Sequence, residues 1–123
     1  VRYTKDRSGG NEESLFNAIR GCSHIIHVAS PIPSDQNKVS NAEMVKQATE
    51  GIRSILKACT QFKVKKLIVT SSCGTINGSA WKGEKDISYS EEDFAFGKPG
   101  KIDGYMESKI MQEQECINYL KEQ

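Results

Sequence analysis

A long amphipathic segment between two short apolar runs constrains the fold of this chain more than any other feature. From about Ser40 to Phe62, apolar residues recur at intervals of one, three and four, as on one face of an α-helix. The flanking runs, His24–Ala29 and Val64–Ser71, are rich in β-branched residues and have the length of strands. A helix of about 22 residues between two strands is typical of a crossover between parallel strands. The sequence therefore predicts a strand–helix–strand unit at its centre.

Helical patterns also precede and follow this unit. The segment Glu12–Arg20 predicts a short helix that Gly21 ends, because glycine adopts a left-handed conformation at low cost. Helical spacing returns over Tyr105–Lys121. The run Leu67–Val69 is apolar throughout, as in strands buried on both faces of a parallel sheet. This order of elements predicts an α/β fold in which a right-handed crossover joins parallel strands.

Charge and composition exclude several classes of protein. Seventeen Lys and Arg residues stand against sixteen Asp and Glu residues, so the net charge is +1 and a strongly basic nucleic-acid surface is not expected. The longest apolar runs are only a few residues, far short of the roughly 20 that span a bilayer. No charged and then apolar leader opens the chain. We therefore expect a soluble cytoplasmic protein, or a piece of one, with neither nucleic acid nor membrane as a partner.

The cysteines form no metal or redox motif. No C-x-x-C pair occurs, so no metal site is predicted. Cysteines in an intracellular chain are expected as free thiols, some of them buried as small hydrophobic side chains. The four residues are Cys22, Cys59, Cys73 and Cys116.

A stretch rich in Gly, Ser, Lys and Asp covers Cys73–Gly104. At about 30 residues it is longer than a structural connection needs, which favours a functional loop. Its aromatic residues Trp81, Phe94 and Phe96 could line an apolar substrate pocket, but ordinary packing is the more expected role.

Tyr105 and Lys109 form the first candidate site. Residues four apart share one face of a helix. An ammonium one turn away favours the ionised form of a phenol, so Tyr105 could deliver or accept a proton near neutral pH. The alternative is an ordinary surface pair.

Two strand ends provide further candidates. Thr70-Ser71-Ser72 follows the second strand, and ligands of open α/β sheets bind outside the carboxyl ends of the strands. A hydroxyl there could stabilise charge on a substrate oxygen, or could instead cap a helix or a turn. After the first strand, the small residues of Val28-Ala29-Ser30 let the backbone approach a ligand closely. His27 before them is expected as a structural imidazole rather than a catalytic one.

The joint order of these motifs resembles the extended short-chain dehydrogenase/reductase superfamily, also called the NAD-dependent epimerase/dehydratase family. Within it, the chain is most similar to the dihydroflavonol-reductase-like branch. The resemblance extends from about Glu13 onward. It rests on Ala18–Cys22, His27–Pro31, Ala48–Gly51, Val64–Ser72, Tyr89–Phe94 and Tyr105–Gln114.

The resemblance implies an oxidoreductase that reduces the carbonyl group of a ketone or aldehyde to an alcohol. The implied cofactor is NADP or NAD, with NADP the slightly favoured of the two, and the implied partner is a small carbonyl or alcohol substrate. By the same resemblance, Tyr105 is the proton donor or acceptor, Lys109 assists it and binds the nicotinamide ribose, and Ser72 orients the substrate carbonyl. Ser71 is the less expected stand-in for Ser72. The residues implied to line the cofactor are Val28, Ala29, Ser30, Thr70, Tyr105 and Lys109.

The chain departs from the family pattern at its start. It has no G-x-x-G-x-x-G turn for a pyrophosphate, since Gly9-Gly10 lacks both the spacing and a preceding apolar strand. Val1–Lys5 is a weak strand pattern. We therefore expect a partial Rossmann-type parallel sheet with flanking helices, lacking the first βαβ unit and the C-terminal part. Residues 1–123 would be the middle portion of one NAD(P)-binding domain. The alternative is an inactive truncated or degenerate family member, or an interaction module without a cofactor.

Overall fold

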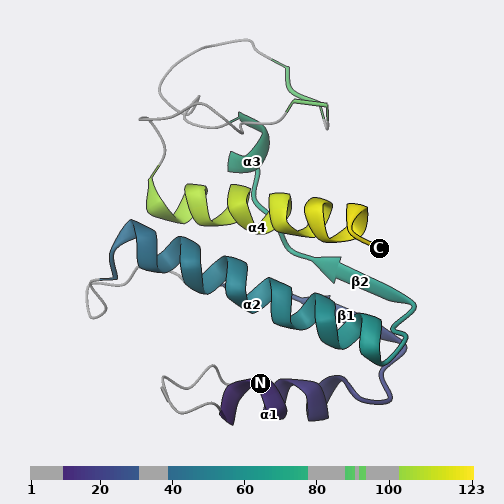
Figure 1. Cartoon of the computed structure of the whole chain (residues 1–123). Helices are drawn as coiled ribbons and strands as arrows, with labels where there is room; N and C mark the ends of the chain where they lie inside the picture. Colours follow the sequence, from purple (N-terminus) through teal and green to yellow (C-terminus); the bar gives the residue numbers. More distant parts are fainter. Residues whose placement is uncertain (1–9, 31–38, 78–87, 91, 94–102) are drawn as a thin grey trace.

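The computed structural model describes residues 10–30, 39–77, 88–90, 92–93 and 103–123. Its elements are α1 (Gly10–Ile19), β1 (His24–His27), α2 (Asn41–Gln61), β2 (Lys66–Val69), α3 (Gly74–Asn77) and α4 (Gly104–Lys121). Figure 1 shows α2 between α1 and α4 in one layer, with the strands behind them. The predicted α/β class is confirmed, because helices flank a parallel sheet as in part of a Rossmann-type fold.

The two described strands pair in parallel. Their register places His24 opposite Lys66 and His27 opposite Val69. Thr70 extends the pairing by one residue, because its amide donates to the carbonyl of His27 at 2.9 Å. Both strands therefore end at the same edge of the sheet, as a strand–helix–strand unit requires.

Helix α2 begins and ends at local signals in the sequence. The Oγ of Ser40 accepts a hydrogen bond from the amide of Glu43 at 3.2 Å, which satisfies one of the free donors of the first turn. After α2, Lys63 has a positive φ of 55°, and the amide of Val64 donates back to the carbonyl of Cys59 at 2.9 Å. This turn directs the chain into β2.

The core lies where the helices meet one face of the sheet. Ile52 of α2 is fully buried and lies in one cluster with Ile19, Ile55, Leu56 and Ala58. Side chains that alternate along the strands, Ile25, Leu67 and Val69, pack against this cluster. Burial of this apolar area is the main stabilising term of the fold.

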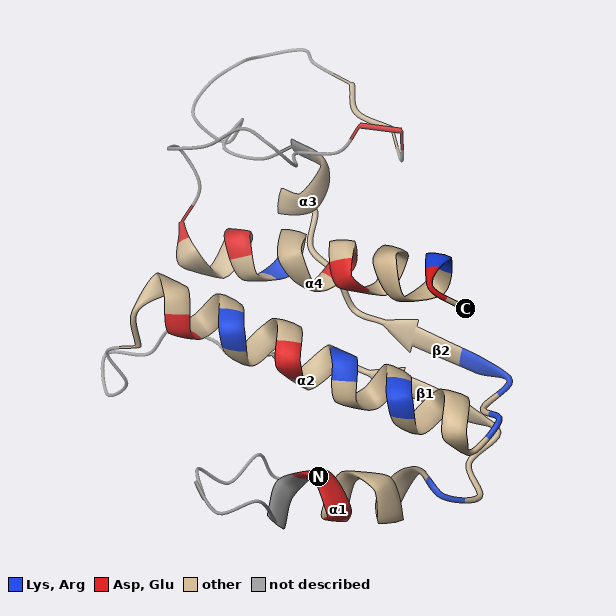
Figure 2. Ribbon diagram, viewed as in Figure 1, with Lys and Arg blue, Asp and Glu red and all other residues tan. Residues whose placement is uncertain are grey.

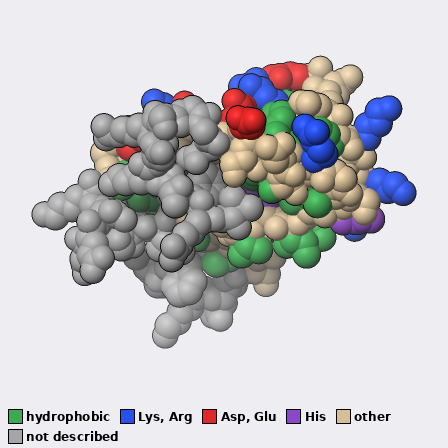
Figure 3. Space-filling model, turned by 90° about the horizontal axis from the view of Figure 1, so that it is seen from below, with side chains coloured by type: hydrophobic (Ala, Val, Ile, Leu, Met, Phe, Trp, Pro, Cys, Tyr) green, Lys and Arg blue, Asp and Glu red, His purple; other side chains and the backbone are tan. Residues whose placement is uncertain are grey.

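The opposite face of the sheet is apolar and exposed. Ile26 is 69% exposed and its register partner Ile68 is 47% exposed. Figure 3 shows hydrophobic side chains at the surface on one side of the molecule, beside a histidine. The expectation that Leu67–Val69 is buried on both faces is therefore wrong in the described part of the chain, where the helices cover one face of the sheet.

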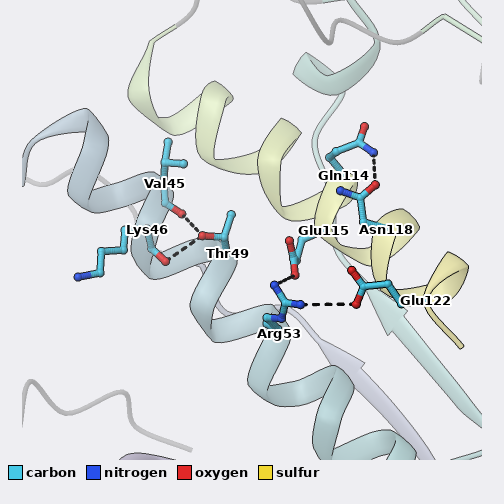
Figure 4. Close-up of polar contacts among 8 residues, drawn as sticks. All are labelled: Val45, Lys46, Thr49, Arg53, Gln114, Glu115, Asn118 and Glu122. Atoms are coloured by element: carbon cyan, nitrogen blue, oxygen red, sulfur yellow. Dashed lines mark hydrogen bonds and ion pairs between the residues drawn. The ribbon is translucent and has the colours of Figure 1, made fainter.

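Charged residues are spread along the helices α1, α2 and α4 (Figure 2). One of them, Arg53 of α2, reaches α4, where it forms ion pairs with Glu115 at 3.1 Å and Glu122 at 3.5 Å (Figure 4). The Arg53 side chain is 48% exposed, so solvent screens these pairs and each contributes about 1 kcal/mol or less. The two ion pairs link α2 to α4 but contribute little to the free energy of folding.

Most element boundaries agree with the sequence to within two residues, although both strands are shorter than predicted. Gly21 ends the first helical segment with a φ of 81°, and all four cysteines are free, as predicted. The short helix α3 was not predicted. The weak strand pattern Val1–Lys5, Gly9, Pro31 and the loop aromatics Trp81, Phe94 and Phe96 lie outside the described residues. No helix in the described part of the chain combines the length and apolarity needed to cross a membrane.

Candidate active site

The carboxyl ends of β1 and β2 bring two of the predicted segments together. The hydrogen bond from the Thr70 amide to the His27 carbonyl holds the strand ends side by side. Val28–Ser30 leaves from one strand end and Ser71 and Ser72 leave from the other. The candidate residues therefore share one edge of the sheet, which is where ligands of parallel sheets bind.

Helix α4 brings Lys109 to this edge. Asp103 caps the helix, since its Oδ1 accepts from the amide of Met106 at 2.8 Å. Two turns later, the Nζ of Lys109 donates to the carbonyl of Thr70 at 2.9 Å. The Lys109 side chain is buried, and burial lowers the pKa of its ammonium below the ordinary value of 10.5. A buried lysine tied to a strand end is not the surface residue that was the alternative expectation.

Tyr105 lies one helical turn before Lys109 and is half-buried. Its carbonyl accepts from the Oγ of Ser108 at 2.6 Å, within the same turn of α4. No hydrogen bond joins the side chains of Tyr105, Lys109 and Ser72 to one another. The structure thus brings the turn that carries Tyr105 to the site without a hydrogen bond among the three side chains.

The two serines after β2 have different partners. The Oγ of Ser71 donates to Glu113 of α4 at 2.6 Å, so its proton is already used. The Oγ of Ser72 accepts from the amide of Gly74 at 3.2 Å, and its carbonyl accepts from Thr75 at 2.8 Å. Ser72 therefore starts the turn into α3, which was the alternative expectation, yet its hydroxyl proton remains available to a ligand.

The turn after Ser72 lies directly against the first turn of α4. A Cβ atom at Gly74 would stand 2.8 Å from the Cγ of Met106, so the two segments approach too closely for any larger residue at Gly74 to fit without a shift. Met106 follows Tyr105 in sequence. Ser72 and Tyr105 are thus carried by segments in contact, although the distance between their hydroxyl groups is set by side-chain orientation.

Val28–Ser30 leaves the sheet with little cover. Val28 is 64% exposed and Ala29 is also exposed, so the backbone here is accessible to a ligand. The Oγ of Ser30 is buried and makes no hydrogen bond within the described residues. An unpartnered buried hydroxyl costs free energy unless something satisfies it.

Sequence reasoning missed two polar residues of this site. Gln112 is buried and lies between Lys109, at 3.5 Å, and the Nε2 of His27, at 3.4 Å. Glu113 accepts from Ser71. Both are three or four positions after Lys109 and so share its side of the helix, which is the signal that could have identified them.

His27 is half-buried between the sheet and α4. Its pKa is lowered from 6.5, first by burial and second by the positive charge of Lys109. The ring is therefore favoured in its neutral form, as befits the structural imidazole that the sequence suggests.

Comparison with known proteins shows which family and which relatives this chain resembles. Residues 10–118 match the 3-beta hydroxysteroid dehydrogenase/isomerase family. The chain is 36% identical over 116 residues to a dihydroflavonol 4-reductase of Medicago sativa, which covers 92% of this chain and 53% of the relative. It is 36% identical over 115 residues to a bifunctional dihydroflavonol 4-reductase/flavanone 4-reductase of Pyrus communis, which covers 91% of this chain and 33% of the relative. A dihydroflavonol 4-reductase of Zea mays is 34% identical over 117 residues.

The chain thus spans about a third to a half of the length of the curated relatives it matches. The matched region contains every residue of the strand-end site described above. The names of these relatives confirm the predicted resemblance to the dihydroflavonol-reductase-like branch. The chain belongs to the 3-beta hydroxysteroid dehydrogenase/isomerase family.

Proposed function

We propose that this chain carries the proton-transfer group and part of the cofactor site of an NAD(P)-dependent reductase that converts a ketone or aldehyde to an alcohol. The observation that carries the proposal is the buried ammonium of Lys109, held 2.9 Å from the Thr70 carbonyl at the end of the sheet. Among the described residues this ammonium has no carboxylate partner, and a buried charge without such a partner is costly and typical of functional sites.

The residues at the strand ends fit a nicotinamide dinucleotide. Lysine has three N–H donors, and two protein oxygens, on Thr70 and Gln112, accept from Lys109. Within the described residues the third N–H has no acceptor, which leaves it for a ribose hydroxyl. The exposed backbone at Val28 and Ala29 and the unpartnered hydroxyl of Ser30 could take further contacts with such a cofactor.

The chemical roles follow from the residue types. A nicotinamide, when bound, supplies the hydride that reduces the carbonyl carbon. Tyr105 donates its phenolic proton to the carbonyl oxygen, and the ammonium of Lys109 one turn away stabilises the phenolate that remains. The free hydroxyl proton of Ser72 orients the carbonyl oxygen through a hydrogen bond.

Cofactor binding by the full chain tests the proposal. NADPH and NADH at millimolar concentration should raise the melting temperature, because a ligand that binds only the folded state stabilises it. Lys109→Met should remove this shift, whereas Lys121→Met, an exposed lysine on the same helix, should retain it. A native chain that shows no shift with either cofactor would instead favour an inactive family member or an interaction module.

Turnover tests the proton donor separately. In a chain that reduces a ketone or aldehyde with NADPH or NADH, Tyr105→Phe should lower kcat by about 10²- to 10⁴-fold, the range for loss of a general acid. Tyr119→Phe removes a hydroxyl from the same helix, where it bonds Thr60 at 3.1 Å, and should leave kcat unchanged. Equal rates for Tyr105→Phe and the native chain would contradict the role of Tyr105.

A further inference from the structure

A network of three polar side chains, Lys109, Gln112 and His27, links α4 to β1 beside the candidate active site. Lys109 is 3% exposed and Gln112 is 2% exposed. The Nζ of Lys109 lies 3.5 Å from the Oε1 of Gln112, and the Nε2 of Gln112 lies 3.4 Å from the Nε2 of His27. The proposed reaction uses Lys109, but assigns nothing to the imidazole and little to the amide. Buried polar groups in such a network are retained only when each has a hydrogen-bond partner.

The donors and acceptors of these three side chains permit one arrangement. An ammonium can only donate, so the amide of Gln112 must turn its oxygen toward Lys109. Its NH₂ group then faces His27, whose Nε2 must accept. This arrangement requires a neutral imidazole with its proton on Nδ1.

Protonation of His27 would break this arrangement. Both ring nitrogens would then carry hydrogens, and Nε2–H would face the NH₂ group of Gln112. The amide can accept from the ring only by turning over, which places its NH₂ group against the ammonium of Lys109. Lys109 would keep the Thr70 carbonyl and lose its second acceptor.

The surroundings of His27 add no opposing charge. Lys109 of α4 is the charged group that acts on the ring, and it disfavours the protonated form. The register partner on β2 is the apolar Val69. The buried side of α2 is likewise apolar, with Ala48 and Ile52 among its residues. Within the described part of the chain, the ionisation of His27 reaches Lys109 by direct charge repulsion, and the amide of Gln112 is the group that also links the two side chains by hydrogen bonds.

We propose that Gln112 is a positioning residue whose amide couples the ammonium of Lys109 to the ionisation of His27. With His27 neutral, Gln112 holds the ammonium beside the end of β2. With His27 protonated, the amide turns over and the ammonium loses that support. The role of Lys109 in this inference rests on the proposed function, whereas the coupling itself does not.

Nuclear magnetic resonance of the full chain, labelled with ¹⁵N in its histidine and lysine side chains, tests the coupling. Above the midpoint of the titration, His27 should show the neutral form protonated at Nδ1. The Nζ signal of Lys109 should shift with the same midpoint as the His27 ring. A Lys109 signal that does not follow the His27 titration would overturn the proposal, and this result needs no variant that must fold.

Two matched variants sharpen the test. Gln112→Met keeps the length of the side chain but removes both polar groups, so the change in the Lys109 signal across the His27 titration should shrink to the part that direct charge repulsion carries. Gln114→Met removes an amide from the same helix that pairs with Asn118 at 2.8 Å (Figure 4), so the coupling should persist. A change in the Lys109 signal that is as large in Gln112→Met as in the native chain would overturn the proposal.

Cofactor addition separates this inference from the proposed function. A native chain that shows the shared midpoint but does not bind NADPH or NADH would support the coupling and contradict the proposed function. A chain that binds cofactor while Lys109 ignores the His27 titration would support the function and overturn the coupling.

Discussion

Ile52→Ala should lower the free energy of unfolding far more than Ile26→Ala, although the two substitutions remove the same atoms. Ile52 is fully buried in the layer between the helices and the sheet, whereas Ile26 is 69% exposed on the opposite face. Removal of a fully buried isoleucine side chain leaves a cavity as well as lost burial, and costs about 3 kcal/mol. The pair therefore tests which face of the sheet carries the core.

The magnitude for Ile26 follows from its exposure. Full burial of an isoleucine is worth about 1.5–3 kcal/mol, and Ile26 gains only about a third of that. Its replacement should cost about 1 kcal/mol or less, so the variants should differ by roughly 2 kcal/mol, about 30-fold in the folding equilibrium.

Urea unfolding followed by far-ultraviolet circular dichroism measures both variants against the native chain. The midpoint should fall for Ile52→Ala and change little for Ile26→Ala, with the same slope in all three. An equal loss of stability in the two variants would mean that the face with Ile26 is also packed, which would refute the one-sided arrangement. A native chain without a cooperative transition would refute it as well.

Three further predictions follow from charge and burial. Arg53→Ala should lower the free energy of unfolding by less than about 1 kcal/mol, and added salt should shrink the difference, because its ion pairs are half-exposed. Burial and then Lys109 lower the pKa of His27 from 6.5, so its neutral form contributes stability that is fully present above pH 6.5 and lost as the pH falls through the lower folded value. His27→Leu should therefore lose less stability than the native chain between about pH 7 and pH 5, measured by urea unfolding. Burial, followed by nearby glutamates, raises the pKa of the Cys116 thiol, so iodoacetamide should modify exposed Cys22 before Cys116, as read by mass spectrometry of the peptides that contain each cysteine.

Long periodic patterns made the fold predictable. The apolar face of α2 extends over five turns, and no other regular structure buries residues at that spacing. The strands follow from β-branched runs on either side, but their ends depend on pairing. Val64 and Ser71 match the pattern and still lie outside β2, because β1 pairs only with Lys66–Val69. The short helix α3 has a single turn, too little for any periodic signal.

The sequence predicted those parts of the candidate site whose residue spacing places them on one face of a helix or at the end of a strand. The four-residue separation of Tyr105 and Lys109 gave the helical pair, and the position of Thr70 after an apolar run gave the strand end. Gln112 was missed because an uncharged polar residue on an amphipathic helix is usually solvated. Its burial depends on contact with His27, 85 residues earlier in the chain, which no local pattern encodes.

The contact between Lys109 and the end of β2 follows from the topology of the sheet. In a parallel pair the carbonyl groups of one strand accept from the other, and pairing stops where the chains separate. Thr70 donates to His27 but lies beyond the last paired residue of β2, so its carbonyl has no strand partner in the described sheet. A strand-end carbonyl of this kind is free to accept from a side chain, and Lys109 donates to it from the helix that runs past the strand ends. The end of the sheet therefore fixes the ammonium, and the helical spacing of α4 then fixes Tyr105 one turn away. A substitution that lengthened the pairing beyond Thr70 would give this carbonyl another donor and release Lys109 from the site.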